Sequence, residues 1–183
     1  DGFMYALRRL QNHFDGNAAD LSNMMRRQGD TFSYVNYAAY NTGFTLYDSY
    51  SYGEKHNEAN GEENRDGQNY NCSYNHGIEG DTKRREVIRA RYTGMRTAFL
   101  LMLASQGVPM ILAGDELANT QYGNNNPYCQ DNATGWIKYR HSQARDRLDA
   151  YLAALIAFRK SHPVLASDYE LKRNDHRSMG FPD

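Results

Sequence analysis

The apolar positions of the chain follow a helical period in several segments. The first repeats at four-three-four spacing and predicts a helix over residues 3–14, with the stripe Phe3, Leu7, Leu10 and Phe14. Asp15-Gly16 should end this helix, because glycine readily adopts the left-handed cap conformation. A second, short helix is predicted over residues 18–27, with Asn17 as its cap.

Two short runs have the composition of strands instead. Phe32–Ala39 is rich in aromatic and β-branched residues, and Val108–Ala113 is continuously apolar, as in a parallel strand buried on both faces. Between them a helix is predicted over residues 81–105, capped by Asp81 or Thr82, with the apolar stripe Ile88, Tyr92, Met95, Phe99 and Met102. These elements predict an α/β fold built on a βαβ unit with a right-handed crossover.

The C-terminal part of the chain is predicted to hold one more long helix. It spans about residues 142–161, ends at Pro163, and carries the apolar positions Leu148, Leu152, Leu155 and Ile156. Residues 168–172 are a weak strand candidate, and residues 44–52 a short aromatic helix candidate.

Both predicted strands end in small polar residues that lead into polar loops. Asn41-Thr42-Gly43 follows the first strand and Gly114-Asp115-Glu116 the second. Two loops rich in asparagine come after them, over residues 51–81 and 119–132. Tyrosines spaced through the first of these loops favour an ordered functional loop over disorder. Because α/β barrels carry their sites on the loops beyond the carboxyl ends of their strands, we expect the functional residues there.

Composition narrows the class of protein. A chain of 183 residues suits one domain, and a net charge of −1 gives no electrostatic footprint for nucleic acid or an anionic membrane. No run approaches the roughly 20 apolar residues of a membrane span. No leader-peptide pattern opens the chain, which says little about a longer parent protein. The compartment stays open, with a cytoplasmic location favoured over secretion. Fifteen tyrosines beside one tryptophan suit stacking on sugars but also protein contacts.

The sequence predicts neither a metal nor a cofactor. His56 and His76 have acidic neighbours but no HxxxH or HExxH spacing, and Asp66-Gly67 lacks the EF-hand pattern for calcium. The two cysteines lie too far apart for a metal-type pair. The helix predicted over residues 81–105 begins with three arginines, Arg84, Arg85 and Arg89. Positive charge near a helix amino-terminus is unfavourable, so these side chains either make contacts with other groups or are simply solvated.

Three stretches carry a specific resemblance. They are GFTLYDSYSYGEKHNEANGEENRDGQNYNCSYNHGIEG, SQGVPMILAGDE and YGNNNPYCQDNATGWIKY. In this order they resemble the isoamylase-type glycogen debranching enzymes of glycoside hydrolase family 13, which hydrolyse α-1,6 branch linkages on a (β/α)8 TIM barrel. The resemblance implies a partial barrel over residues 1–165, with strands seven and eight at Phe32–Ala39 and Val108–Ala113 and helices flanking them. Residues 166–183 would be a tail or the start of a following β domain.

The same resemblance implies that catalytic residues are absent from this chain. The family's nucleophile and general acid lie on earlier strands, and its third acid is the Asp of a His-Asp-Gly sequence. Asn41 and Thr42 occupy the His and Asp positions here. A retaining glycosidase needs two carboxylates about 5 Å apart, and loss of a transition-state contact costs about 100-fold or more in rate. Asp48 matches an aspartate that the family already has, so it is not expected to substitute.

The resemblance also suggests which residues bind substrate. Asp115 and Glu116 are adjacent in sequence, so their side chains diverge and cannot act as a catalytic pair. The substrate-binding candidates are Asn41, Thr42, Phe44, Lys55, His56, Asn57, Asp115, Glu116 and Tyr128.

Two functions therefore compete. The chain is either a fragment of an α-1,6-glucan debranching hydrolase, inactive on its own, or a non-catalytic α-glucan-binding or interaction protein derived from one. The expected partners are a weakly bound α-glucan and either a second copy of the chain or the remainder of the barrel, because two strands cannot close a barrel and leave unpaired edges.

Overall fold

The computed structural model describes residues 2–16 and 18–171. Within these ranges the elements follow the order α1 (Gly2–Gln11), α2 (Ala18–Arg26), β1 (Val35–Asn36), α3 (Arg85–Leu103), β2 (Val108–Pro109) and α4 (Gln143–Ser161). Short 3-10 turns lie at Asp48–Tyr50, Glu58–Asn60, Asp115–Leu117 and Pro163–Ala166. The rest of the described chain is loop.

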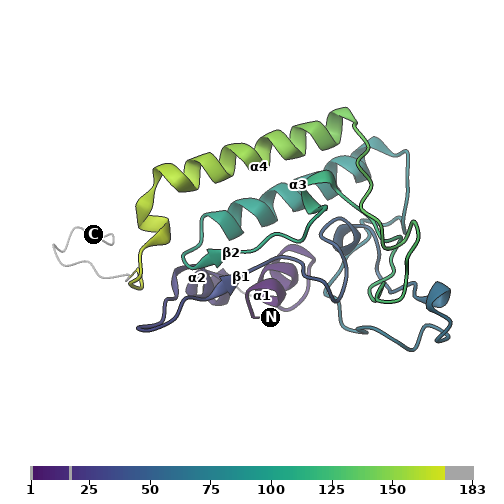
Figure 1. Cartoon of the computed structure of the whole chain (residues 1–183), viewed down its shortest axis with the longest axis horizontal. Coiled ribbons are helices and arrows are strands. Elements are labelled where there is room, and N and C mark those ends of the chain that lie inside the picture. The colour runs from purple at the N-terminus through teal and green to yellow at the C-terminus, as the bar shows by residue number, and fades with distance from the viewer. Residues whose placement is uncertain (1, 17, 172–183) are drawn as a thin grey trace.

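The two strands form a small parallel sheet in which Val35 is paired with Val108 and Asn36 with Pro109. Figure 1 shows α3 connecting the strands and lying beside α4, with α1 and α2 near the strands. The predicted parallel βαβ arrangement is confirmed. Whether it belongs to a closed barrel remains a prediction.

The predicted strands are much longer than the observed ones. Residues 32–39 and 108–113 were expected to be extended throughout, but only two residues of each pair with the other. The hydrogen bonds between the two segments run from the Val108 amide to the Tyr34 carbonyl and from the Met110 amide to the Asn36 carbonyl, both at 2.8 Å, and a strand ends where such bonds end. Val108 is half exposed, at 50%, so the expectation of burial on both faces is wrong for this chain.

The helices agree better with their apolar patterns. In α3 the predicted stripe is buried at Tyr92, Met95, Phe99 and Met102, and in α4 it is buried at Leu148, Leu152 and Leu155. Ser142 caps α4 by accepting a 3.3 Å hydrogen bond from the Arg145 amide. The cap predicted for α3 is wrong, because the helix begins at Arg85 and the Thr82 hydroxyl accepts only from the Arg84 amide.

The first helix ends earlier than its stripe predicted. It stops at Gln11, and His13, rather than Gly16, takes the left-handed conformation with φ 64°. The chain turns there, which leaves Leu10 and Phe14 exposed while Phe3 and Leu7 enter the core. The predicted cap of α2, Asn17, lies outside the described residues.

A single apolar cluster joins the helices to one another and to the segment after β1. Phe3 and Leu7 from α1 meet Met95, Phe99 and Met102 from α3 and Leu148 and Leu152 from α4, together with Leu46 and Tyr50 from the segment after β1. Residues 44–52 form turns around Asp48–Tyr50 instead of the predicted helix. The strand candidate at 168–172 is not a strand over residues 168–171, and the rest of the predicted tail lies outside the described residues.

Candidate functional site

The two asparagine-rich loops leave the carboxyl ends of the parallel strands and lie against each other. Figure 1 shows both loops gathered at one end of the molecule. The His56 amide donates to the Gly123 carbonyl at 2.7 Å, and the Gly43 amide donates to the Asn125 carbonyl at 2.9 Å. The loop after β1 is therefore ordered, as predicted, through contacts with the loop after β2.

A reciprocal pair of asparagines forms the centre of this contact. The Asn57 amide group donates to Asn125 Oδ1 at 2.9 Å, and the Asn125 backbone amide donates to Asn57 Oδ1 at 2.9 Å. The Asn125 side chain also donates to the Gln68 carbonyl at 2.7 Å and to Asn71 Oδ1 at 2.9 Å. Asn57 and Asn125 are both buried. Buried amides satisfied on all sides fix a loop geometry, because any rearrangement leaves polar atoms unpaired.

A second layer of amides lies beside this pair. Asn60 Nδ2 donates to Asp66 Oδ2 at 2.7 Å, and Asn126 Nδ2 donates to the same oxygen at 2.8 Å. Burial is the largest single influence and raises the pKa of Asp66, but the hydrogen bonds from Asn60 and Asn126 and further hydrogen bonds together outweigh it, so the pKa is lowered. Asn124 Nδ2 donates to Asn60 Oδ1 at 2.7 Å. The carboxylate of Asp66 therefore bridges the two loops and is not directed toward solvent as a metal ligand.

Gly67 makes this packing possible. Its φ is +71°, and a Cβ built there would lie 2.2 Å from Asn125 Oδ1 and 2.6 Å from Asn57 Nδ2. Only glycine fits this left-handed position against the asparagine pair.

An arginine from α1 donates hydrogen bonds to the backbone of the segments that follow β1. Arg8 is buried, and its guanidinium donates to the Ala38 carbonyl at 2.7 and 3.0 Å, and at 3.3 Å to the carbonyls of Phe44 and Asn71. Burial lowers the pKa of Arg8, with partial compensation from nearby groups that include Asp115. The guanidinium of Arg8 thus connects α1 with the chain directly after β1, at Ala38 and Phe44, and with the asparagine-rich loop at Asn71.

Asp48 is a buried carboxylate with two strong donors. It accepts from the Thr120 hydroxyl at 2.5 Å and from the Gln121 amide at 2.8 Å. Burial raises the pKa of Asp48 to about 6, although these hydrogen bonds oppose the shift. Asp48 therefore ties the segment after β1 to the loop after β2 and has no free oxygen directed toward a ligand.

The adjacent acids after β2 have different surroundings. Asp115 is buried and accepts from the Leu46 amide at 2.9 Å, and burial raises its pKa to about 7 against the effects of that amide and Arg8. Glu116 Oε2 accepts from the Gly114 amide at 2.8 Å. Each carboxylate therefore accepts a hydrogen bond from the backbone.

The other predicted site residues fall into two groups. Asn41, Thr42, His56 and Tyr128 are exposed, and Tyr128 has 92% of its surface accessible. Phe44 and Asn57 have no accessible surface, so in this structure they position the loops and do not touch a ligand. Lys55 lies between these extremes and donates to the Asp66 carbonyl at 2.6 Å.

His56 carries one interaction that the sequence patterns did not suggest. Its Nε2 lies 3.0 Å from Glu79 Oε1, and the Glu79 carboxylate also accepts from the Gly53 amide at 3.0 and 3.1 Å. This contact closes the loop after β1 upon itself. Within the described chain, no three His, Cys, Asp or Glu side chains gather in a way that could hold a metal ion.

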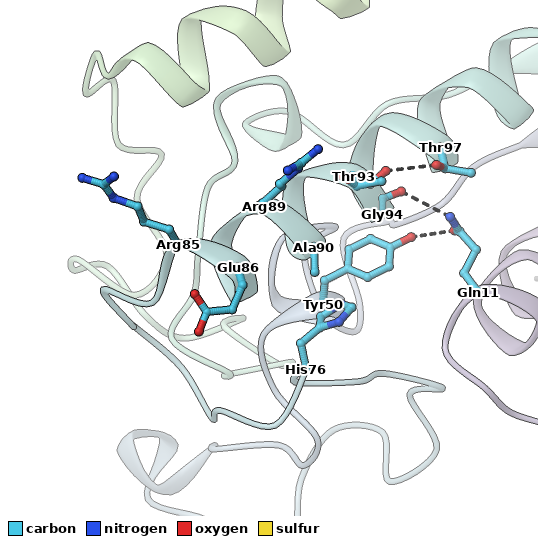
Figure 2. A pocket seen from close by; sticks show the side chains of 10 residues that line it. All are labelled: Gln11, Tyr50, His76, Arg85, Glu86, Arg89, Ala90, Thr93, Gly94 and Thr97. Carbon is cyan, nitrogen blue, oxygen red and sulfur yellow. Dashed lines mark hydrogen bonds between the residues drawn. The ribbon is translucent and has the colours of Figure 1, made fainter.

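One pocket lies away from all of these residues. It has a volume of about 670 Å³ and is lined by residues of α1, the segments around Tyr50 and His76, and the first half of α3. Figure 2 shows Tyr50 donating to Gln11, at 2.6 Å, and Gln11 in turn donating to the Gly94 carbonyl, at 3.3 Å. The residues that line this pocket include none of the substrate-binding candidates.

Sequence reasoning missed the residues that hold the site together. Asn60, Asn124, Asn125 and Arg8 were not singled out, although the run Asn124-Asn125-Asn126 is unusual enough to have drawn attention. Among residues 2–16 and 18–171, none of the helices has the length and apolar character needed to cross a membrane.

Comparison with known proteins finds similarity to a glycogen debranching enzyme. No protein-family model matches the chain. Over 156 residues, 85% of its length, the chain is 47% identical to the glycogen debranching enzyme of Enterobacter sp. (strain 638). The match covers only 23% of that enzyme, so the chain is similar to one segment of a much longer debranching enzyme.

Proposed function

We propose that this chain is a segment of the catalytic barrel of an isoamylase-type, family 13 debranching glycosidase, and that it supplies part of the α-glucan-binding surface without the catalytic acids. The observation that carries the proposal is the pair of polar loops beyond the two parallel strands, locked together through Asn57 and Asn125. A site for a flexible polysaccharide needs a surface held rigid before the ligand arrives.

The 47% identity to a segment of a debranching enzyme supports the same reading. Exposed groups on and beside the locked loops suit a sugar: the Asn41 amide, the Thr42 hydroxyl and the ring of Tyr128. Amides and hydroxyls pair with sugar hydroxyls, and a tyrosine ring stacks on the apolar face of a pyranose.

Hydrolysis by this chain alone is not expected. Asp48 and Asp115 are buried and hydrogen-bonded, Glu116 accepts from its own turn, and Thr42 has no charge to offer. Among the residues that the structure describes, no exposed pair of carboxylates therefore lies at the strand ends. Release of reducing ends from pullulan or glycogen, abolished by Asp115→Ala or Glu116→Ala, would overturn this part of the proposal.

Binding can be tested directly. The 183-residue chain is titrated with maltoheptaose and a branched dextrin, followed by side-chain amide NMR signals. We expect an affinity near 1 mM, equivalent to about 4 kcal/mol. Tyr128→Ala should weaken it severalfold, whereas Tyr139→Ala, which removes an exposed ring outside the two loops, should not. No response at about 10 mM glucan would rule out glucan binding by this chain.

Thr42 favours a second candidate function. The uncharged residue at the family's third acid position suits a protein that retains glucans without cleaving them. The test is a chain in which Thr42→Asp is combined with the remaining barrel of a related debranching enzyme. Activity only with the aspartate would support a non-catalytic glucan-binding protein derived from a debranching enzyme. Full activity with threonine would support a segment of an active debranching hydrolase.

A further inference from the structure

A second pocket, between α3 and α4, is lined by arginines. It has a volume of about 460 Å³, and Arg85, Arg89, Arg96 and Arg147 line it together with Gln143, Tyr92, Ile88 and Ala144. We call the four arginines and the pocket that they line the arginine groove. No aspartate or glutamate is among its lining residues. The whole chain has a net charge of −1, so this concentration of cations is local.

These arginines have no carboxylate partner in the described part of the chain. The ion pairs found there involve Arg26, Arg65, His56 and His141. Arg96 donates to the Thr93 hydroxyl at 3.2 Å, a neutral acceptor. Four like charges around one pocket repel one another unless an anion lies between them.

The helices themselves add to the positive potential. Figure 1 shows α3 and α4 running side by side in the same direction, so their amino-terminal ends lie together. Arg85 and Arg89 belong to the first turns of α3, and Gln143, Ala144 and Arg147 to the first turns of α4. Helix amino-terminal ends carry partial positive charge and favour anions.

The acidic residues nearby are directed elsewhere. Asp146, in the first turn of α4, lies 3.1 Å from His141. Glu86, in the first turn of α3, lines the other pocket with Tyr50 and His76, and Arg85 and Arg89 border both pockets. Figure 2 shows the guanidinium groups of Arg85 and Arg89 turned away from Tyr50 and His76.

We propose that the arginine groove binds a small organic phosphate. Guanidinium groups form paired hydrogen bonds with phosphate oxygens, and several of them together match a multiply charged group better than a single carboxylate. Tyr92, Ile88 and Ala144 give the pocket an apolar side that can contact the rest of such a ligand. A volume of about 460 Å³ accommodates a molecule of sugar-phosphate size, but not a folded acidic protein segment.

This inference is independent of the proposed glucan site, because none of the glucan-binding candidates lines the groove. The probe is inorganic pyrophosphate, titrated calorimetrically into the 183-residue chain at low ionic strength. We expect one binding event with submillimolar affinity, weaker binding of orthophosphate, and loss of affinity as salt rises. Glucose 6-phosphate should bind, and glucose should not.

The variants locate the site. Arg89→Gln combined with Arg147→Gln should weaken pyrophosphate at least tenfold, whereas Arg65→Gln, which removes an exposed arginine in the loop after β1, should leave it unchanged. Circular dichroism verifies the fold of each variant. Maltoheptaose binding should survive in the double variant, so failure of this inference is distinguishable from failure of the proposed function.

Three results would overturn the inference. Pyrophosphate binding that is equal in the double variant and the unaltered chain would place the anion elsewhere. Absence of binding by every phosphate would make the groove a solvated face. Binding of polyglutamate with none of pyrophosphate would identify the groove as a surface for an acidic protein partner.

Discussion

At Asn125, one buried side chain joins three segments of the chain. It bonds to Asn57, to the Gln68 carbonyl and to Asn71, over distances of 2.7 to 2.9 Å. We expect Asn125→Ala to lower the free energy of unfolding by about 2 to 4 kcal/mol, because buried partners would be left unpaired. Urea unfolding followed by circular dichroism measures this.

The matched control is Asn132→Ala in the same loop. Asn132 is exposed, and its bonds to Gln130 and Thr134 are local. Its replacement should cost less than about 1 kcal/mol, since water can satisfy the partners that remain. Equal losses at the two positions would contradict a special role for the buried asparagine pair.

The buried carboxyl group of Asp115 makes the stability of the fold depend on pH. Burial raises its pKa to about 7, above the value of 3.8 expected in the unfolded chain. The folded state therefore holds the proton more tightly, and this group's stabilising effect is lost as pH rises from about 4 to about 7. Asp48, with its pKa raised to about 6, acts in the same direction.

His76 acts in the opposite direction, because burial lowers its pKa, so a difference measurement is needed. We expect Asp115→Asn to make the free energy of unfolding depend less on pH between pH 4.5 and 7.5. At the higher pH the variant should be more stable than the unaltered chain by about one to a few kcal/mol. Its amide oxygen can still accept from Leu46. Parallel pH profiles for the two proteins would show that Asp115 ionises without a penalty.

At the scale of elements, Gly67 and Gly61 form a natural comparison within one loop. Both have left-handed backbone, with φ of +71° and +77°, but a Cβ at Gly61 meets nothing within 4 Å, while at Gly67 it strikes Asn125 and Asn57. Gly61→Ala should cost about 1 kcal/mol from backbone strain alone. Gly67→Ala should cost clearly more and should abolish glucan binding in the NMR titration. Glucan binding unchanged in Gly67→Ala would mean that the asparagine pair does not shape the site.

The helices could be predicted from the sequence because their apolar period is a local property. Met95, Phe99 and Leu152 face the core as their spacing indicated. The positions of the strands could be predicted but their lengths could not, since a strand's length depends on hydrogen-bonded neighbours, and within the described residues each strand has one neighbour. The strands are parallel as predicted, but only the pairs Val35 with Val108 and Asn36 with Pro109 form.

The site was predicted in outline only. The loops and several of their exposed residues were identified through resemblance, but Phe44 and Asn57 proved to be buried supports. Asparagine has no periodic signature, so the bonds from Asn125 to Asn57 and from Asn124 to Asn60 could not be read from spacing. Long-range polar pairing becomes visible only when the loops are seen in three dimensions.

For the whole molecule, the short sheet leaves apolar surface uncovered. Val35 is 47% exposed and Val108 50%, and Met110 beside them is also exposed. Exposed large side chains each forfeit about 1.5 kcal/mol of burial, so we expect the chain to self-associate or to require the rest of a barrel. Sedimentation across a dilution series measures this.

A charge placed on that surface supplies the control. Val108→Lys should shift the chain toward monomer, whereas Val164→Lys, at a similarly exposed position in the turn after α4, should not. A compact monomer that unfolds cooperatively at low micromolar concentration in the unaltered chain would show that the exposed strands need no cover.

Arg8 has a consequence for how this protein can be divided or inherited. Its guanidinium satisfies carbonyls of Ala38, Phe44 and Asn71, which belong to segments far along the chain. Cleavage or gene rearrangement between α1 and β1 would strip those buried carbonyls of their donor while leaving every residue of the loops intact. The loops therefore cannot be transferred to another protein by themselves. Any descendant or designed chimera that keeps the loops must also keep α1.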